Sequence, residues 1–131
     1  DILKAKLPGN AAEDSVSILP CLLGTATGPI REATVHQAPG GLAIRQGPWK
    51  LVSHRSGEQE LFNLESDISE TKNVTAENEE VVRRLTSLMQ SYIDRGRSTP
   101  GAAQKNEFAL SVSFGGKDSE KKKRKRARER Q

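Results

Sequence analysis

The sequence predicts an α+β fold in which a small antiparallel sheet of three to four strands packs against a long C-terminal helix, with a disordered basic tail behind it. Two observations favour this class: β-prone runs between turn residues from 32 to 64, and an apolar stripe with helical spacing from 79 to 95. The composition limits the size of the core. Only 34% of the residues are hydrophobic and 4% are aromatic, so part of the chain is expected to be unpacked.

Residues 1–24 are expected to hold the end of a core element followed by a short helix. Ser17 can cap this helix, Pro20 then falls in its first turn, and Gly24 ends it. Cys21 lies within this apolar helix, so we interpret it as a packing residue; cysteines in such a setting act as nucleophiles in roughly a few per cent of cases. It is the only cysteine, which excludes an intrachain disulfide and a thiolate metal cluster.

Four β-prone runs separated by turns occupy residues 32–64 and predict an antiparallel meander. Alternation along the third run places Trp49 and Val52 on opposite faces of the sheet. The single long helix covers only one of these faces. We expect the other face to carry Val52, Ile44 and Leu61, and therefore to need a partner that covers it.

A helix over residues 79–95 has the strongest periodic signal in the chain. Asn78 is suited to cap its start, Arg95 places positive charge at its end, and Gly96 stops it. The apolar residues recur every three to four positions and predict one continuous stripe that faces the core. The stripe consists of Val81, Val82, Leu85, Leu88, Met89, Tyr92 and Ile93.

The positive charge of the chain is concentrated at its C-terminal end. Residues 117–131 hold nine Lys and Arg against three acids, a charge of +6, which leaves −2 on the rest of a chain whose net charge is +4. The residues that fit a nuclear-localisation or phosphate-binding pattern are Lys121, Lys122, Lys123, Arg124, Lys125 and Arg126. This run contains no aromatic residue for base stacking. We favour a disordered charge tail over specific nucleic-acid binding by about three to one.

The sequence also argues against several classes of function. No apolar run approaches the ~18 residues of a membrane span. No catalytic set is visible, and two histidines are too few for an all-histidine metal site. His36 precedes a Gly-rich turn, which favours an ordinary strand-end histidine over a ligand by roughly four to one. The start at Asp1, with no initiator Met and no signal-peptide pattern, indicates the middle of a longer chain.

Six stretches carry family information through their order and spacing. They are EDSVSILPCLLG (13–24), PIREATVH (29–36), AIRQGPWKLV (43–52), ELFNL (60–64), DISETKN (67–73) and EVVRRL (80–85), the last running on to RGRSTP (95–100). Together they resemble the arylsulfatase-type sulfatases, most closely the bacterial, planctomycete-like members. The resemblance covers residues 1–106 and leaves 107–131 as an unmatched extension.

This resemblance implies the C-terminal subdomain of a sulfatase, packed on a large N-terminal catalytic core of alkaline-phosphatase type that this chain lacks. Family members hydrolyse sulfate esters with a formylglycine, made from the Cys or Ser of a Cys/Ser-x-Pro-x-Arg motif, beside a Ca²⁺ held by Asp and Asn residues. The motif is absent here, since Leu22 and Leu23 follow Cys21. The resemblance therefore implies no cofactor bound by this chain, no activity by itself, and a sulfate-ester substrate only together with the core. It also implies a periplasmic or secreted enzyme.

One residue of the substrate pocket is implied by the same resemblance. In relatives a Val-His stretch lies towards the pocket and is often followed by a second His. His36 fits this position, while Gln37 and Ala38 depart from the pattern. An alternative interpretation makes the chain a free-standing interaction module whose basic run at 121–126 binds polyanions.

Overall fold

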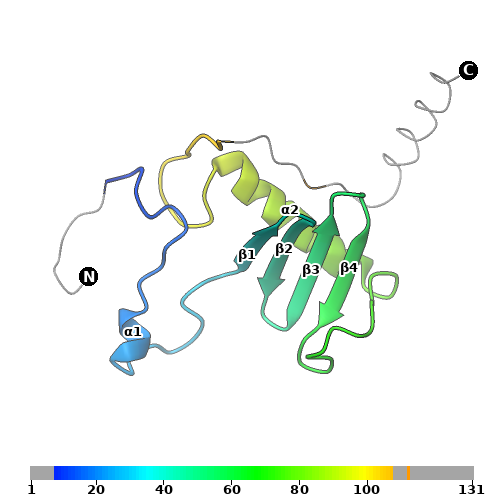
Figure 1. The fold of residues 1–131 in the computed structure, drawn as a ribbon. Coiled ribbons are helices and arrows are strands. Elements are labelled where there is room, and N and C mark those ends of the chain that lie inside the picture. The colour runs from blue at the N-terminus through cyan, green and yellow to red at the C-terminus, as the bar shows by residue number, and fades with distance from the viewer. Residues whose placement is uncertain (1–7, 108–111, 113–131) are drawn as a thin grey trace, which may run out of the picture.

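The computed structural model describes residues 8–107 and 112, and shows an antiparallel sheet crossed on one face by a long helix (Figure 1). The sheet has four strands in the order β1-β2-β3-β4, which confirms the predicted α+β class. The elements are α1 (Leu19–Leu22), β1 (Thr34–Ala38), β2 (Gly41–Gln46), β3 (Trp49–His54), β4 (Gln59–Asn63) and α2 (Glu79–Arg95). Residues 1–7 and the basic run at 121–126 lie outside the described residues. Within the described part, no helix is long and apolar enough to cross a membrane.

Tight turns join the first three strands. Pro39 and Gly40 alone separate β1 from β2, and a second two-residue turn at 47–48 separates β2 from β3. Gly41, which begins β2, lies so close to β3 that a Cβ on it would stand 2.1 Å from the carbonyl oxygen of Ser53. Only glycine fits such a close approach, and turns this short set the register between their strands.

Three leucine and isoleucine side chains from neighbouring strands form the centre of the core. Ile44 lies directly opposite Leu51 in the register, and Leu51 lies opposite Leu61. Directly opposed residues share a face of the sheet, so all three point towards α2, where they are fully buried. The prediction that Ile44 and Leu61 lie on the uncovered face is therefore wrong, because the register places both beside Leu51.

The face turned away from α2 is polar at its surface, because Phe62, which lies there opposite Lys50, is buried. Val52 lies there as predicted, with Glu60 opposite it in the register. Glu60 pairs with His54 on the same face at 2.7 Å, and Lys50 pairs with Glu70 at 2.6 Å. Charged side chains at this density suit water or a polar partner better than an apolar one.

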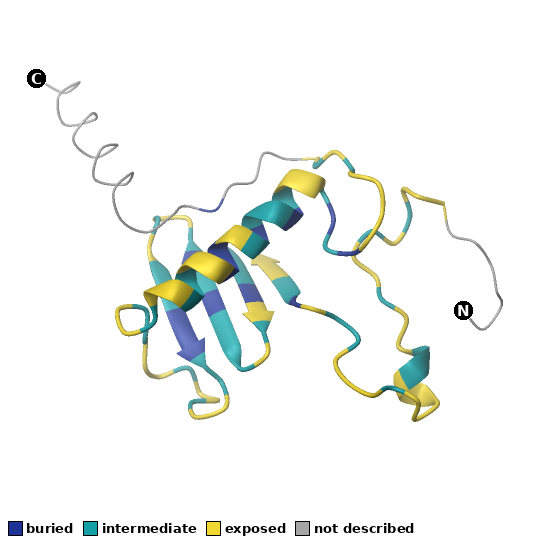
Figure 2. Ribbon diagram, turned by 180° about the vertical axis from the view of Figure 1, so that it is seen from behind, coloured by how far each residue is buried: buried dark blue, intermediate teal, exposed yellow. Residues whose placement is uncertain are grey.

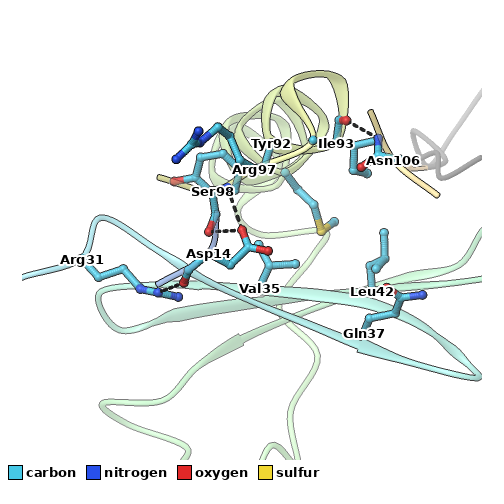
Figure 3. Close-up of a pocket in the computed structure, with 12 residues that line it drawn as sticks. Asp14, Arg31, Val35, Gln37, Leu42, Tyr92, Ile93, Arg97, Ser98 and Asn106 are labelled. Atoms are coloured by element: carbon cyan, nitrogen blue, oxygen red, sulfur yellow. Dashed lines mark hydrogen bonds between the residues drawn. The ribbon is translucent and has the colours of Figure 1, made fainter. Parts of the chain in front are cut away.

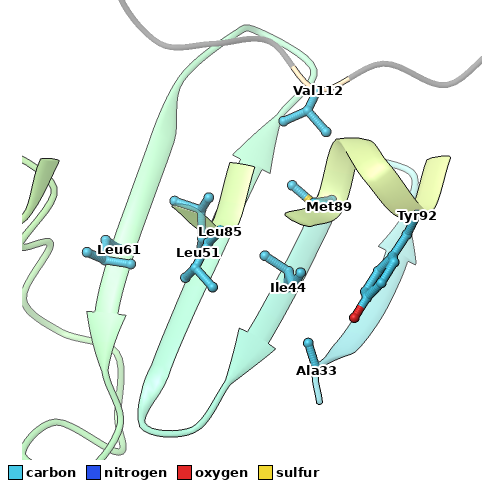
Figure 4. Close-up of a cluster of buried hydrophobic side chains, with 8 residues drawn as sticks. All are labelled: Ala33, Ile44, Leu51, Leu61, Leu85, Met89, Tyr92 and Val112. Atoms are coloured by element: carbon cyan, nitrogen blue, oxygen red, sulfur yellow. The ribbon is translucent and has the colours of Figure 1, made fainter. Parts of the chain in front are cut away.

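The helix α2 supplies the second layer of the core. It spans Glu79–Arg95, the predicted range, and ends at Gly96 in the left-handed conformation with a φ of 62°. Asn78 occupies the cap position without a side-chain capping bond, and its Nδ2 donates to the carbonyl of Val74 at 3.1 Å. The stripe residues that are buried against the sheet (Figure 4) are Leu85, Met89 and Tyr92.

The short helix α1 lies apart from the sheet and from α2 (Figures 1 and 2). Pro20 falls in its first turn and Gly24 follows in the left-handed conformation, as predicted. Ser17 Oγ accepts the first helical N–H at 3.3 Å, although the residue at the cap position is Ile18. No residue of α1 is buried and Cys21 is exposed, so the predicted packing role of Cys21 is wrong.

Candidate functional site

A hydrogen-bonded network at the end of α2 joins two segments that are far apart in the sequence. Arg97 is buried, and its guanidinium donates to the carbonyl oxygens of Gly9 at 3.2 Å, Thr99 at 3.0 Å and Ala102 at 3.0 Å. Its Nη2 donates to the Thr99 hydroxyl at 3.2 Å. A buried charge is tolerated when its donors find acceptors. Arg97 therefore ties the segment before α1 to the loop that follows α2.

Asp14 holds the same two segments together. Its Oδ1 accepts both the N–H and the hydroxyl of Ser98, at 2.8 and 2.7 Å, across 84 positions of sequence. Its backbone carbonyl accepts a bond from Nη2 of Arg31. One carboxylate oxygen thus accepts two donors from the same residue, and this contact orders the loop that follows α2.

A cavity of about 310 Å³ opens beside this network, between α2 and the β1–β2 side of the sheet (Figure 3). Its volume is at the lower end of the ~300–1,000 Å³ found for ligand pockets. One side is polar and comes from the network, and the other is apolar and comes from the sheet and α2. The residues that define these two sides are Asp14, Arg31 and Ser98, and Val35, Leu42 and Ile93.

Tyr92 also lines the cavity and links α2 to the segment before β1. Burial raises the pKa of its phenol, and the hydrogen bond that it donates to Glu32 at 3.1 Å raises it further. The guanidinium of Arg95 lies 5.4 Å from the centre of the ring and opposes this shift. A phenol with a raised pKa stays neutral at ordinary pH, so Tyr92 acts as a hydrogen-bond donor and not as a base.

His36 does not line this cavity. It is exposed on β1, opposite Ala43, on the face turned away from α2. Its neighbours Val35 and Gln37 line the cavity from the other face, since successive residues of a strand alternate. The structure thus separates the cavity from His36, whose role in substrate binding stays a prediction.

The residues present do not fit the cofactors that the resemblance implies. The described part of the chain holds no group of three His, Cys, Asp or Glu residues placed to bind a metal ion, so no Ca²⁺ site can be built there. Cys21 is not followed by the proline and arginine that formylglycine formation requires. Ser98 is followed by Pro100 at the right spacing, but Ala102 stands where the motif needs arginine.

Comparison with known proteins gives one consistent relationship. No family model matches the chain. The chain is similar to an N-acetylgalactosamine-6-O-sulfatase of Bacteroides thetaiotaomicron, with 34% identity over an alignment of 110 residues; the match covers 72% of this chain and 21% of that protein. It thus spans about a fifth of this relative's length. A solved Bacteroides thetaiotaomicron sulfatase, from work on the metabolism of multiple glycosaminoglycans, matches with a TM-score of 0.61 and 34% identity, over 69% of this chain and 22% of that one.

Proposed function

This chain is a sulfatase homologue that matches a fragment of a sulfatase, and we propose that it serves as the C-terminal subdomain of a sulfate-ester hydrolase. The observation that carries the proposal is an identity of 34% over 110 residues that correspond to only 21% of the relative. The TM-score of 0.61 at the same identity supports a shared architecture for this part. In this role the chain completes the fold of the enzyme and contributes a wall of its substrate pocket.

The hydrolytic chemistry is assigned to a catalytic core outside the residues described. The described residues offer neither a formylglycine precursor nor a metal site, and the only serine–proline spacing that approaches the motif has its hydroxyl bound to Asp14. Formylglycine and Ca²⁺ would supply a nucleophile and charge stabilisation in that core. The chain by itself should therefore hydrolyse no sulfate ester.

The polar face of the sheet is the proposed site of contact with the substrate pocket. His36 is exposed on this face, where the paired His54 and Glu60 also lie. An imidazole donates a hydrogen bond in its neutral form and carries a positive charge when protonated, and both forms suit an anionic sulfate ester. His36 reaches the substrate only if the core approaches this face.

A chimeric enzyme tests the proposed function. The 131-residue chain would replace the matched fifth of the Bacteroides N-acetylgalactosamine-6-O-sulfatase, and hydrolysis of an aryl sulfate would be measured. We expect turnover by the chimera and background rates for the isolated chain. The matched control is the same relative with its fifth deleted, which should be inactive.

Two results would refute the proposed function. One is aryl sulfate turnover by the isolated chain above background, which would place catalytic groups within these residues. The other is a chimera no more active than the deletion control, which would deny that the chain can complete a sulfatase fold.

We also propose that the whole enzyme is periplasmic or secreted, as the resemblance implies. Fractionation of the source cells, with an antibody against this chain, measures where it accumulates. Recovery with the cytoplasmic fraction alone contradicts export.

A further inference from the structure

The segment before β1 forms a projecting loop that is closed at its base. We name residues 15–30 the prong. Its base is held by the bond that Arg31 donates to the carbonyl of Asp14, and Asp14 is itself fixed by two bonds from Ser98 at 2.8 and 2.7 Å. The prong carries α1 and stands away from the sheet in both ribbon views (Figures 1 and 2). A pinned base and a projecting tip mean that the rest of the chain presents the prong in a defined place.

The tip of the prong is apolar and exposed. Ile18, Leu22 and Leu23 are 57%, 70% and 66% exposed, and α1 contains no buried residue. The core cluster and the hydrophobic residues packed around it include none from the prong. Exposed apolar groups gathered at one place mark a surface that is covered in the working protein.

The length of α1 supports the same conclusion. Isolated helices shorter than about 12–15 residues are marginal in water, and α1 has 4 residues. Bonds from Thr25 to the carbonyl of Pro20 close the turn behind it, at 2.9 Å from the backbone N–H and 3.3 Å from the hydroxyl. So short an element gains most of its stability from whatever it packs against, and the described part of the chain supplies no such surface.

We propose that the prong is the element through which this chain docks on the sulfatase catalytic core, with Ile18, Leu22 and Leu23 inserted into an apolar groove of that core. The inference rests on the proposed function. The comparison supports this occupant, since the match covers only 21% of the relative's length. The polar face of the sheet offers no comparable apolar surface, because it carries the Lys50–Glu70 and His54–Glu60 pairs.

Cys21 makes docking directly measurable. It is the only cysteine of the chain, it lies on α1, and it is exposed. In the chimera, the rate of maleimide labelling would be followed by mass spectrometry of the peptide that contains Cys21. We expect labelling at least about tenfold slower in the chimera than in the isolated chain, because a reagent then reaches the thiol only when the prong opens.

Substitutions at the tip separate docking from folding. The double variant Leu22→Asp with Leu23→Asp should leave unfolding of the isolated chain unchanged, because both side chains are exposed there. In the chimera it should restore fast labelling of Cys21 and lower aryl sulfate turnover at least about tenfold. Ile68→Asp is the matched control. Ile68 is 76% exposed and lies outside the prong, so its variant should leave both readings unchanged.

Three other results would overturn docking of the prong on the core. An active chimera in which Cys21 stays as reactive as in the isolated chain overturns docking and leaves the proposed function intact. An inactive chimera refutes the proposed function and, with it, this inference. Slower labelling of the isolated chain at higher protein concentration, together with a dimer in sedimentation, would assign the prong to a second copy of this chain and overturn docking on the core.

Discussion

Replacing Gly96 by alanine should destabilise this fold by more than the backbone strain of a left-handed residue alone. Gly96 ends α2 with a φ of 62°, in the region that favours glycine. A Cβ at this position would stand 2.1 Å from the carbonyl oxygen of Gln104 and 2.7 Å from its carbon. The loop cannot simply move aside, because the N–H of Gln104 donates to the carbonyl of Arg95 at 2.8 Å.

Two costs add up at this position. The left-handed conformation costs a residue with a Cβ about 1–2 kcal/mol. Displacing a packed loop by one carbon atom costs about 1–3 kcal/mol more. The Gly96→Ala variant should therefore lose about 2–5 kcal/mol of the free energy of unfolding, and its thermal midpoint should fall by at least about 8 °C in a domain of this size.

Gly47→Ala is the control that isolates the clash. Gly47 has a similar φ of 57°, but a Cβ there meets nothing within 4 Å. Its variant should lose only the backbone cost of about 1–2 kcal/mol. Urea unfolding would be followed by the fluorescence of Trp49, the only tryptophan, which packs against the core cluster. Equal losses in the two variants would refute the argument, since they would show that the Gln104 loop yields without cost.

Other perturbations test the core, the 63–72 loop and the tail. Leu51→Ala should lose about 2–5 kcal/mol in the same urea assay, because the side chain is fully buried between the sheet and α2; a loss under about 1 kcal/mol contradicts that assignment. Backbone N–H bonds from Lys72 and Thr71 lower the pKa of the Asp67 carboxyl. Its stabilising contribution is thus present above the ordinary value of 3.8 and lost as the pH falls through the lowered pKa. Asp67→Asn should flatten this acid-side loss in midpoints measured against pH, and an unchanged profile would assign the loss to other groups. Deleting residues 117–131 should abolish any salt-sensitive binding to heparin, and binding that survives the deletion would lie in the rest of the chain.

The bounds of α2 could be predicted because every local signal agrees. A helical stripe begins at Val81 and ends at Ile93, acidic residues occupy the first turn, and Gly96 follows the last one. Such agreement between periodicity, charge and stop residue specifies an element from neighbours alone. That Asn78 makes no side-chain capping bond could not be predicted in the same way, since its amide nitrogen donates to the carbonyl of Val74, which precedes the helix.

Whether the face on which a strand residue lies can be predicted from the sequence depends on the length of the turn before its strand. The two-residue turn at 47–48 pairs Gln46 with Trp49, and counting back along both strands pairs Ile44 with Leu51. The length of this turn was therefore enough to predict that Ile44 lies on the same face of the sheet as Leu51. Leu61 is harder, because four residues at 55–58 separate β3 from β4 and allow more than one register.

The contacts that bring Asp14 to Ser98 span 84 positions, and no spacing rule connects such distant residues. In the prong the apolar pattern is clear from the sequence, but its apolar side chains pack against no part of the described core. Leu85 and Met89 are fully buried as their pattern predicts, whereas Leu22 and Leu23 follow an equally apolar pattern and remain exposed. An apolar pattern specifies that a surface will be covered but not by which residues. The chain itself buries Leu85 and Met89 of α2 but leaves Leu22 and Leu23 uncovered, and this difference favours a docking partner at the prong over a looser fold.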